Sequence, residues 1–308
     1  MMIDTDPGID DAMATLYAAQ APEIDLVGLT AVFGNVTVDQ ATRNALRLAE
    51  MANLTIPVAR GCARPLIAGP FDPSYHVHGD EGFGTYPAEQ PKAAPHALDA
   101  ADFLIAQARQ YVGELIICPI GPLTNIATAM QRDPDFATNV KKIVLMGGSA
   151  REGGNITPFA EANFYHDPHA AQIVMASRAH VTMVGLDVTH RTWATRDDMA
   201  AVADAAPRLG GFLRDITDFY IDFYVRVRGE QGCFLHDPLA IICATNPELF
   251  QTEQAPVKLI LEGAEAGQTK IDPAHEGYAQ HIAVGVDSAR VKSQFMAGLK
   301  RLDKRVFA

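Results

Sequence analysis

Short apolar runs alternate with amphipathic helical segments along most of the chain. The runs cover residues 25–33, 114–120, 142–146 and 181–188, and continuous apolar runs of this length are typical of strands buried on both faces. Helical patterns occupy residues 9–20, 37–52, 98–111, 124–131 and 168–177. This rhythm predicts right-handed crossovers and an α/β fold, with an open, mostly parallel sheet and helices on both of its faces. A chain of 308 residues can form this as one domain, residues 1–308.

Two stretches break the rhythm. Residues 61–95 are rich in Gly, Pro and His, and a loop of that length in a compact domain is usually functional. Residues 207–237 carry a long helical pattern whose aromatic side chains are most simply core residues. Tyr224, the last of these aromatics, is the best candidate to leave the core and meet a ligand.

The composition excludes several classes of protein. The formal net charge is −12, so no basic stripe is available to bind a nucleic acid polymer. No apolar run approaches the roughly 18 residues that a membrane span needs, and the N-terminus lacks a signal-peptide pattern. We therefore expect a protein of the cytoplasm with neither a nucleic acid polymer nor a membrane as partner.

The four cysteines are scattered without a Cys-x-x-Cys pair, which argues against a zinc site or a disulfide framework. Cys118 and Cys243 lie within apolar runs, so both are interpreted as buried small hydrophobic residues. This use of cysteine fits a reducing compartment.

Four carboxylates fall within eight residues near the N-terminus: Asp4, Asp6, Asp10 and Asp11, with Pro7-Gly8 predicting a turn between a short strand and the first helix. A helix N-cap would explain Asp10 or Asp11 but not both, and it leaves the other two unexplained. Packing such charges together is unfavourable unless a cation lies among them or their pKa values shift. A site made of oxygen ligands suits a hard cation, Ca²⁺ or Mg²⁺.

A second set of side chains follows the predicted strands, where open parallel sheets bind their ligands. The set comprises Asn35, Ile120, Met146, Asn155, Glu161 and Asn163. Each polar member taken singly is most simply a capping or loop residue. Taken together, their Asn and Glu side chains could bind a polyhydroxylated ligand such as a ribose.

His236-Asp237-Pro238 precedes an apolar helical stretch, residues 239–244. Asp237 could be only the N-cap of that helix, with Pro238 at its first position. If Asp237 also reaches the N-terminal carboxylates, it becomes a further metal ligand and carries His236 to the edge of the site. A histidine there could donate a proton near neutral pH.

The N-terminal motif resembles that of the nucleoside hydrolases, the inosine-uridine-preferring N-ribohydrolase family. Further stretches follow in the family's order and approximate spacing: Val32-Phe-Gly-Asn35, Gly121-Pro-Leu-Thr-Asn125, Val144-Leu-Met-Gly-Gly148, Glu161-Ala-Asn163, Val184-Gly-Leu-Asp187-Val-Thr and His236-Asp237-Pro238. The resemblance covers nearly the whole chain, and it implies the Rossmann-like fold of the nucleoside hydrolases.

The resemblance implies a role for each matching position. It implies Ca²⁺ bound by Asp6, Asp11, Asp237 and the main-chain carbonyl of Ile120. It makes Asp6 the general base that deprotonates the attacking water and His236 the acid that protonates the leaving base. The implied ribose-binding residues are Asp10, Asn35, Asn155, Glu161 and Asn163, with Met146 beneath the sugar, and the implied base-side residues are His78, Tyr224 and Arg228.

The implied reaction is Ca²⁺-dependent hydrolysis of the N-glycosidic bond of ribonucleosides. Breaking that bond builds positive charge on the ribose, which an acidic pocket stabilises. Tyr224 and Arg228 favour a broad inosine and uridine specificity, and a pyrimidine preference is the alternative. The family resemblance also implies a homodimer or a homotetramer.

Two other classes of protein compete with this interpretation. Asp4-Thr-Asp6 after a first strand resembles the motif of haloacid-dehalogenase-like phosphatases, but Pro7-Gly8 followed by two aspartates does not fit that family. A non-catalytic, Ca²⁺-dependent nucleoside-binding protein is the other rival. The presence of both Asp6 and His236 argues against it.

Overall fold

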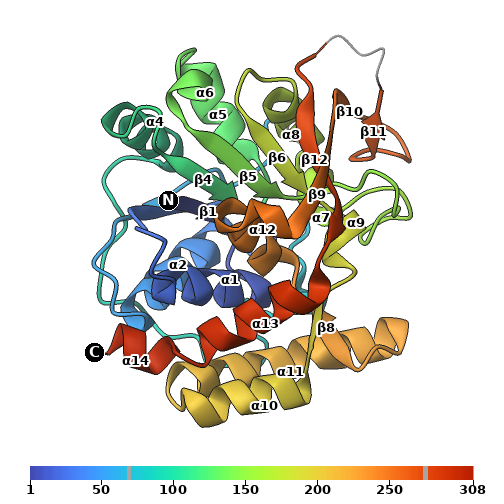
Figure 1. Ribbon diagram of the computed structural model, residues 1–308. Helices are drawn as coiled ribbons and strands as arrows, with labels where there is room; N and C mark the ends of the chain where they lie inside the picture. Colours follow the sequence, from blue (N-terminus) through green and yellow to red (C-terminus); the bar gives the residue numbers. More distant parts are fainter. Residues whose placement is uncertain (68–70, 273–276, 308) are drawn as a thin grey trace.

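The computed structural model describes residues 1–67, 71–272 and 277–307. Its centre is an eight-stranded sheet in the order β3-β2-β1-β4-β5-β6-β12-β9 (Figure 1). The strands of this sheet are β1 (Met2–Thr5), β2 (Gly28–Ala31), β3 (Val58–Arg60), β4 (Ile116–Pro119), β5 (Lys142–Met146), β6 (Val181–Val184), β9 (Phe250–Ala255) and β12 (Gln280–Val286). Neighbouring strands are parallel except for the last pair, β12 and β9. The predicted α/β fold is therefore confirmed.

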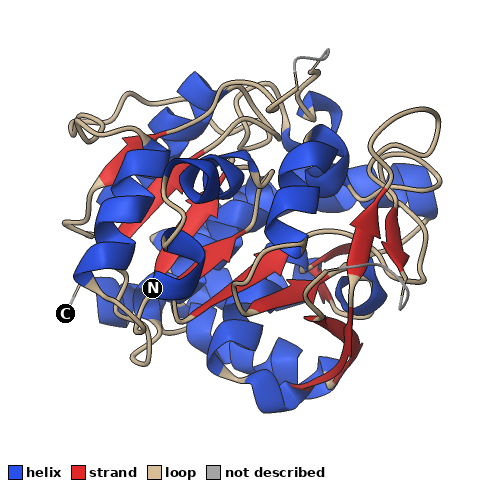
Figure 2. Cartoon of the chain, turned by 90° about the horizontal axis from the view of Figure 1, so that it is seen from above, coloured by secondary structure: helices blue, strands red, loops and turns tan. Residues whose placement is uncertain are grey.

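Helices cover both faces of the sheet (Figures 1 and 2). One face carries α1 (Ile9–Gln20), α2 (Val38–Met51), α11 (Leu209–Arg228), α12 (His236–Thr245), α13 (Ser288–Leu299) and α14 (Leu302–Val306). The other face carries α4 (Ala100–Gln110), α5 (Thr124–Arg132), α6 (Phe136–Asn139) and α8 (Pro168–Met175). No helix among the described residues has the length and apolar character that crossing a membrane requires.

Alternation along the strands divides the apolar side chains between two cores. Ile3 and Val144 point into the core beneath α1 and α12, whereas Met2 and Ile143 point into the core beneath α4 and α5. Both sets are almost fully buried. This explains why the strands read as continuous apolar runs, since each strand has a hydrophobic layer on both sides.

The helices expected from the sequence form within about two residues of their expected ends, and the first, α1, has the expected bounds. The run at residues 181–188 behaves differently, because β6 ends at Val184 and α9 (Leu186–Thr189) begins at once. Gly185 lies close to the carbonyl of Gly148, which accepts a hydrogen bond from the Leu186 amide at 3.0 Å. The expectation of a strand through residue 188 was therefore wrong in its second half.

The two stretches outside the alternating strand-helix pattern form helices of very different length. Residues 61–95 contain the short helix α3 (Tyr75–His78), and residues 68–70 of that predicted loop lie outside the described residues. The long helical pattern is α11, which ends at Gly229 in the left-handed conformation. It packs against α10 (Arg196–Ala205), and the strands β7 (Trp193–Thr195) and β8 (Gly232–Phe234) pair beside it.

The remaining elements lie at the edge of the sheet or after β5. They are α7 (Ala162–His166), the 3₁₀ helix η1 (Pro247–Leu249), and the antiparallel pair β10 (Val257–Leu259) and β11 (Thr269–Ile271). Cys118 and Cys243 are both buried in the core that faces α12, as expected.

A buried asparagine ties the centre of the sheet to α5. Asn125 Nδ2 donates hydrogen bonds to Asp4 Oδ1 at 2.7 Å and to the Ala31 carbonyl at 3.0 Å. Asn125 Oδ1 accepts a hydrogen bond from the backbone amide of Cys62 at 2.8 Å. Thr30 Oγ1 donates to the same Asp4 oxygen at 2.6 Å. These bonds join four chain segments directly below the carboxyl ends of β1 and β2.

We predict that Asn125→Ala lowers the free energy of unfolding by about 3 kcal/mol or more, because it leaves buried polar partners without hydrogen bonds. Urea titration followed by circular dichroism measures this change. The matched control is Asn139→Ala, at a half-buried position at the end of α6, which should cost less than about 0.5 kcal/mol. Equal effects of the two substitutions would contradict this role for Asn125.

Candidate functional site

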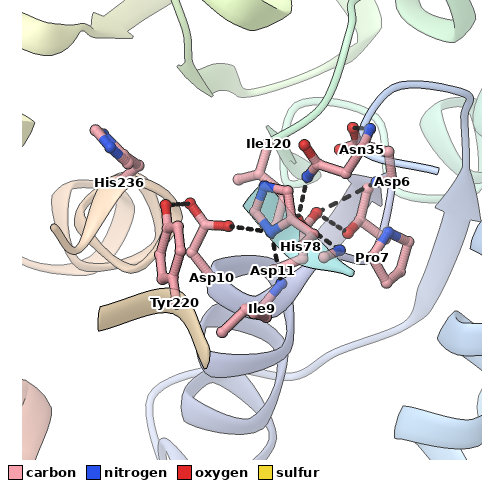
Figure 3. A network of polar contacts seen from close by, with 12 residues as sticks. Asp6, Pro7, Ile9, Asp10, Asp11, Asn35, His78, Ile120, Tyr220 and His236 are labelled. Atoms are coloured by element: carbon pink, nitrogen blue, oxygen red, sulfur yellow. Dashed lines mark hydrogen bonds and ion pairs between the residues drawn. The ribbon is translucent and has the colours of Figure 1, made fainter. Parts of the chain in front are cut away.

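The carboxyl ends of β1 and β4 bring the predicted site residues together. β1 lies between β2 and β4, so the chain leaves the sheet in opposite directions at this point, which is where open α/β sheets form a ligand crevice. Asp6 follows β1 directly, and Ile120 follows β4 directly. Figure 3 shows Asp6, Asp10, Asp11, Asn35 and Ile120 grouped here.

Two glycines allow the chain to close around Asp6. A Cβ atom on Gly34 or on Gly121 would collide with the Asp6 carboxylate. Asp6 Oδ2 accepts a hydrogen bond from the backbone amide of Asn35 at 2.6 Å. Asp6 Oδ1 is buried and has no hydrogen-bond partner among the described residues. One carboxylate oxygen is thus fixed by the backbone and the other is free for a ligand.

Asp11 closes the turn that starts α1. Its Oδ1 accepts from Thr5 Oγ1 at 2.5 Å, and its Oδ2 accepts from the Gly8 amide and from Asn35 Nδ2, both at 3.0 Å. Gly8 is the N-cap residue of α1, so neither Asp10 nor Asp11 is the N-cap. Asp11 lies at the third position of the helix, where a carboxylate satisfies free amides of the first turn.

Three buried carboxylates lie close enough to bind one cation. Oxygens of Asp10, Asp11 and Asp237 all lie within 4.8 Å of one another. This group contains Asp10, which was expected to bind ribose, and it omits Asp6, which was expected to bind the metal. The Oδ1 atoms of Asp6 and Asp10 are both buried without a hydrogen-bond partner among the described residues.

Burial dominates the electrostatics of the carboxylate cluster, defined as Asp6, Asp10, Asp11 and Asp237. It raises the pKa of Asp10 to about 8, with a further contribution from the charge of Asp11. Burial and the neighbouring carboxylates raise the pKa values of Asp6 and Asp237 well above the usual range. Oxygen atoms that are buried, unpaired and mutually repelling fit a hard divalent cation, so these residues could hold a metal.

Asp237 reaches the cluster from α12. The sequence left open that Asp237 is only the N-cap of this helix. The helix instead begins at His236 with Leu235 as its N-cap residue, so Asp237 lies inside the first turn and the N-cap interpretation is wrong. That position directs the Asp237 carboxylate toward Asp11, while His236 precedes it at the helix start.

Glu161 and Asn163 lie at the start of α7. Glu161 is the N-cap residue, and its carboxylate accepts hydrogen bonds from the amides of Gly148, Asn163 and Phe164. Burial raises the pKa of Glu161 to about 7. Asn163 Nδ2 donates to the carbonyl of Ile120 at 3.0 Å, so the carbonyl that was predicted to bind the metal has an amide partner here.

Three other predicted substrate residues differ in exposure. Met146 is buried, and its Sδ lies 3.4 Å from Asn163 Nδ2. Asn155 is exposed, and its Oδ1 accepts from the Ala162 amide at 3.0 Å. Arg228 is exposed at the end of α11, with its guanidinium 5.2 Å from the centre of the Phe234 ring.

A line of hydrogen bonds joins His236 to the carboxylate cluster. His236 Nε2 lies 3.0 Å from the Tyr224 hydroxyl, which lies 3.2 Å from the Tyr220 hydroxyl. Tyr220 donates to Asp10 Oδ2 at 3.4 Å. Figure 3 shows Asp10 and Tyr220 between His236 and the rest of the cluster. The hydroxyl of Tyr224 therefore points toward His236 and the cluster, but its ring stays in the apolar core, so the expectation that it leaves the core was wrong. Its contact with a ligand stays a prediction.

His78 contacts the cluster from α3. Its Nδ1 accepts a hydrogen bond from the Ile9 amide at 3.1 Å, and its ring packs 5.4 Å from that of Tyr220. Burial lowers the pKa of His78 to about 3, so the ring is neutral. Its 3.9 Å approach to Asp10 Oδ1 is consequently not an ion pair.

Sequence reasoning missed Tyr220 and Thr189. Tyr220 stands four residues before Tyr224 on the same face of α11, so helical spacing could have identified it. Thr189 Oγ1 lies 2.8 Å from His236 Nδ1, although the two residues are 47 positions apart. Thr189 ends one of the stretches that carried the family resemblance and directly follows a predicted strand, but neither signal indicated its partner.

Comparison with known proteins gives one consistent answer. The model of the family described as inosine-uridine preferring nucleoside hydrolase matches residues 1–293. Uridine nucleosidase 1 of Arabidopsis thaliana is 41% identical over 273 residues, covering 88% of this chain and 81% of the relative. Inosine-uridine preferring nucleoside hydrolase of Crithidia fasciculata is 37% identical over 311 residues, covering 98% of each chain. The solved purine-preferring ribonucleoside hydrolase from Gardnerella vaginalis has a TM-score of 0.94 at 36% identity, covering 98% of each chain.

The raised pKa values predict an unusual pH dependence of stability in a chelating buffer. Asp4, Asp10 and Glu161, with pKa values of about 7, 8 and 7, retain protons in the folded protein that the unfolded chain has lost. The free energy of unfolding therefore falls as the pH rises from 6.5 to 8, by about 1 kcal/mol for each group. The buried neutral histidines oppose this trend only below about pH 6.5.

Urea titrations at several pH values measure this dependence. Glu161→Gln should reduce the fall by about 1 kcal/mol, whereas Glu262→Gln at an exposed position should leave it unchanged. A stability that is constant or rises between pH 6.5 and 8 would refute the assignment of buried, protonated carboxylates.

Proposed function

The chain belongs to the inosine-uridine preferring nucleoside hydrolase family and is a ribonucleoside hydrolase, and we propose that it uses Ca²⁺ and accepts both inosine and uridine. The observation that carries the proposal is the carboxylate cluster at the switch point of the sheet, joined by hydrogen bonds to His236. In this proposal the cluster provides the group for water activation, and His236 provides the group for leaving-group protonation.

The donor atoms of the cluster favour Ca²⁺ as the cation. Asp11 and Asp237 belong to the three carboxylates that lie within 4.8 Å of one another, and the family resemblance also makes them metal ligands. The other two ligands that the resemblance implies are Asp6 and the Ile120 carbonyl. Buried carboxylate and carbonyl oxygens are hard ligands that suit Ca²⁺. When bound, Ca²⁺ lowers the pKa of a water molecule and neutralises part of the repulsion among the carboxylates.

Asp6 is the proposed general base. The Asn35 amide holds its Oδ2, which leaves the buried Oδ1 free to accept a proton from the attacking water. The backbone at Gly34 and Gly121 lies so close to the Asp6 carboxylate that a Cβ atom at either position would collide with it. Both contacts keep Asp6 in one orientation during the reaction.

The ribose is proposed to lie above Met146, with its hydroxyl groups held by polar side chains around the crevice. The proposed ribose-binding residues are Asp10, Asn35, Asn155, Glu161 and Asn163. Positive charge develops on the sugar as the N-glycosidic bond breaks, and the surrounding carboxylates stabilise that charge. Hydroxyl contacts that strengthen as the ring distorts lower the barrier further.

His236 is the proposed acid for the leaving base. Burial lowers the pKa of His236 well below its usual range, so the ring is neutral at rest and must take up a proton before it gives one to the leaving base. The two tyrosine hydroxyls connect that ring to Asp10, which gives a proton a short route between the two ends of the site. His78, Tyr224 and Arg228 are proposed to lie around the base.

A uridine preference is the second candidate. The relatives at 41% identity include one named uridine nucleosidase, whereas a solved structure at 36% identity is called purine-preferring. One name refers to a pyrimidine nucleoside and the other to purine nucleosides, and the broad specificity that we propose from Tyr224 and Arg228 includes both classes. We further propose that residues 1–308 act as a single domain in a homodimer or homotetramer in the cytoplasm.

A panel of inosine, adenosine, uridine and cytidine tests the proposed function. With Ca²⁺ present, inosine and uridine should both yield ribose and free base, with kcat/KM values within about tenfold of each other. A chelator should lower both rates at least about 100-fold, and added Ca²⁺ should restore them. p-Nitrophenyl phosphate, the control substrate, should give no product.

Other outcomes of this panel separate the alternatives. Turnover of uridine and cytidine alone would establish the pyrimidine preference. Turnover that a chelator leaves intact would refute the Ca²⁺ requirement, and nucleoside binding without release of base would identify a binding protein.

Asp6→Asn tests the general base. We expect kcat for inosine to fall roughly 10³-fold or more at saturating Ca²⁺, while circular dichroism and the unfolding midpoint indicate an intact fold. The control, Asp197→Asn at an exposed position in the first turn of α10, should keep its kcat. Near-normal turnover by Asp6→Asn would refute the assignment of Asp6 as the general base.

A further inference from the structure

Thr189 is a buried residue whose side chain points at the proposed acid. It is the last residue of α9, and its amide donates to the Gly185 carbonyl at 3.1 Å. Asp187, in the same helix, accepts hydrogen bonds from the amides of Ala150 and Arg151 and so fixes α9 against the loop after β5. Thr189 therefore ends a short helix that is anchored to the neighbouring loop, and this anchoring fixes the position of its hydroxyl.

Both nitrogens of the His236 ring are engaged in hydrogen bonds. Nδ1 lies 2.8 Å from Thr189 Oγ1, and Nε2 lies 3.0 Å from the Tyr224 hydroxyl. The ring is 4% exposed and packs against Phe234 and His190, with centroids 5.8 and 5.7 Å away. Aromatic packing limits the tilt of the ring, and the two hydrogen bonds fix its rotation.

The two ring nitrogens have different partners. Nε2 faces Tyr224, whose hydroxyl continues through that of Tyr220 to Asp10 Oδ2. Nδ1 faces Thr189 Oγ1. A threonine hydroxyl can donate to an unprotonated ring nitrogen or accept from a protonated one, so this bond persists when the ring gains or loses a proton.

We propose that Thr189 is a positioning residue, whose hydroxyl bonds His236 Nδ1 in both protonation states of the ring and thereby keeps Nε2 turned toward Tyr224 and the base side of the site. This inference rests on the proposed function in one respect, namely that His236 protonates the base. Thr189 acts only through His236 and has no contact with the reacting atoms.

A matched set of variants separates positioning from a general structural role. Thr189→Val keeps the shape and removes the hydroxyl, so kcat for inosine should fall about tenfold while KM changes less than about twofold. Thr189→Ser restores the hydroxyl and should recover most of kcat. If Thr189→Val does not fold, Thr189→Ala takes its place in the same comparison. A wild-type kcat without the hydroxyl would overturn the proposal.

The double variant Thr189→Val/His236→Ala provides the control. Because Thr189 acts through His236, removing its hydroxyl should cause no further loss of kcat in the His236→Ala background. A tenfold loss in that background as well would assign Thr189 a structural role and overturn the proposal. If His236→Ala alone leaves kcat unchanged, the proposed role of His236 fails, and this result is distinct from a failure at Thr189.

Nitrogen-15 spectra of the histidine rings give a readout that does not depend on turnover. In the wild-type protein, the Nδ1 resonance of His236 should have the shift of a hydrogen-bonded ring nitrogen. Thr189→Val should move it toward the value of an unbonded ring nitrogen, and Thr189→Ser should not. An Nδ1 resonance that Thr189→Val leaves unchanged would contradict the proposal.

Discussion

The mutual repulsion of four buried carboxylates is the constraint on which the rest of the site depends. Asp6, Asp10, Asp11 and Asp237 are all almost fully shielded from water, and burial is the main cause of their raised pKa values. Such a group is unfavourable unless protons or a cation neutralise it. The fold tolerates it because backbone amides and the hydroxyl of Thr5 bind several of the oxygens. The proposed cation would complete that compensation.

The sheet explains why these side chains meet. β1 is the strand at which the chain reverses direction, so Asp6 and the first turn of α1 lie beside Ile120 and the end of β4. The first turn of α12 then brings Asp237 into the carboxylate cluster and holds His236 beside it. The two ends of the site, carboxylates and imidazole, are thus connected by side chains of α11 that span the gap between them.

Local patterns predicted the fold, since strands buried on both faces and amphipathic helices have distinct periodicities. They also identified most of the residues that the structure brings together at the candidate site. The carboxylate cluster was visible because its members stand together in the sequence. Contacts between distant segments were not predictable. Thr189 and His236 are 47 positions apart, so no local pattern indicates their hydrogen bond. No local pattern indicates the bond from Asn163 to the Ile120 carbonyl either. The change from β6 to α9 also depended on a tertiary contact, between Gly148 and Leu186.

Calorimetric titration of the metal-free enzyme with Ca²⁺ tests most directly whether a cation binds the carboxylate cluster. We expect one Ca²⁺ bound per chain, with release of protons at pH 7 because the carboxylates that it neutralises have raised pKa values. Proton release is obtained by repeating the titration in buffers of different ionisation enthalpy. Asp237→Asn should weaken the binding strongly. An absence of Ca²⁺ binding to the wild-type chain, or binding that Asp237→Asn leaves unchanged, would contradict the account.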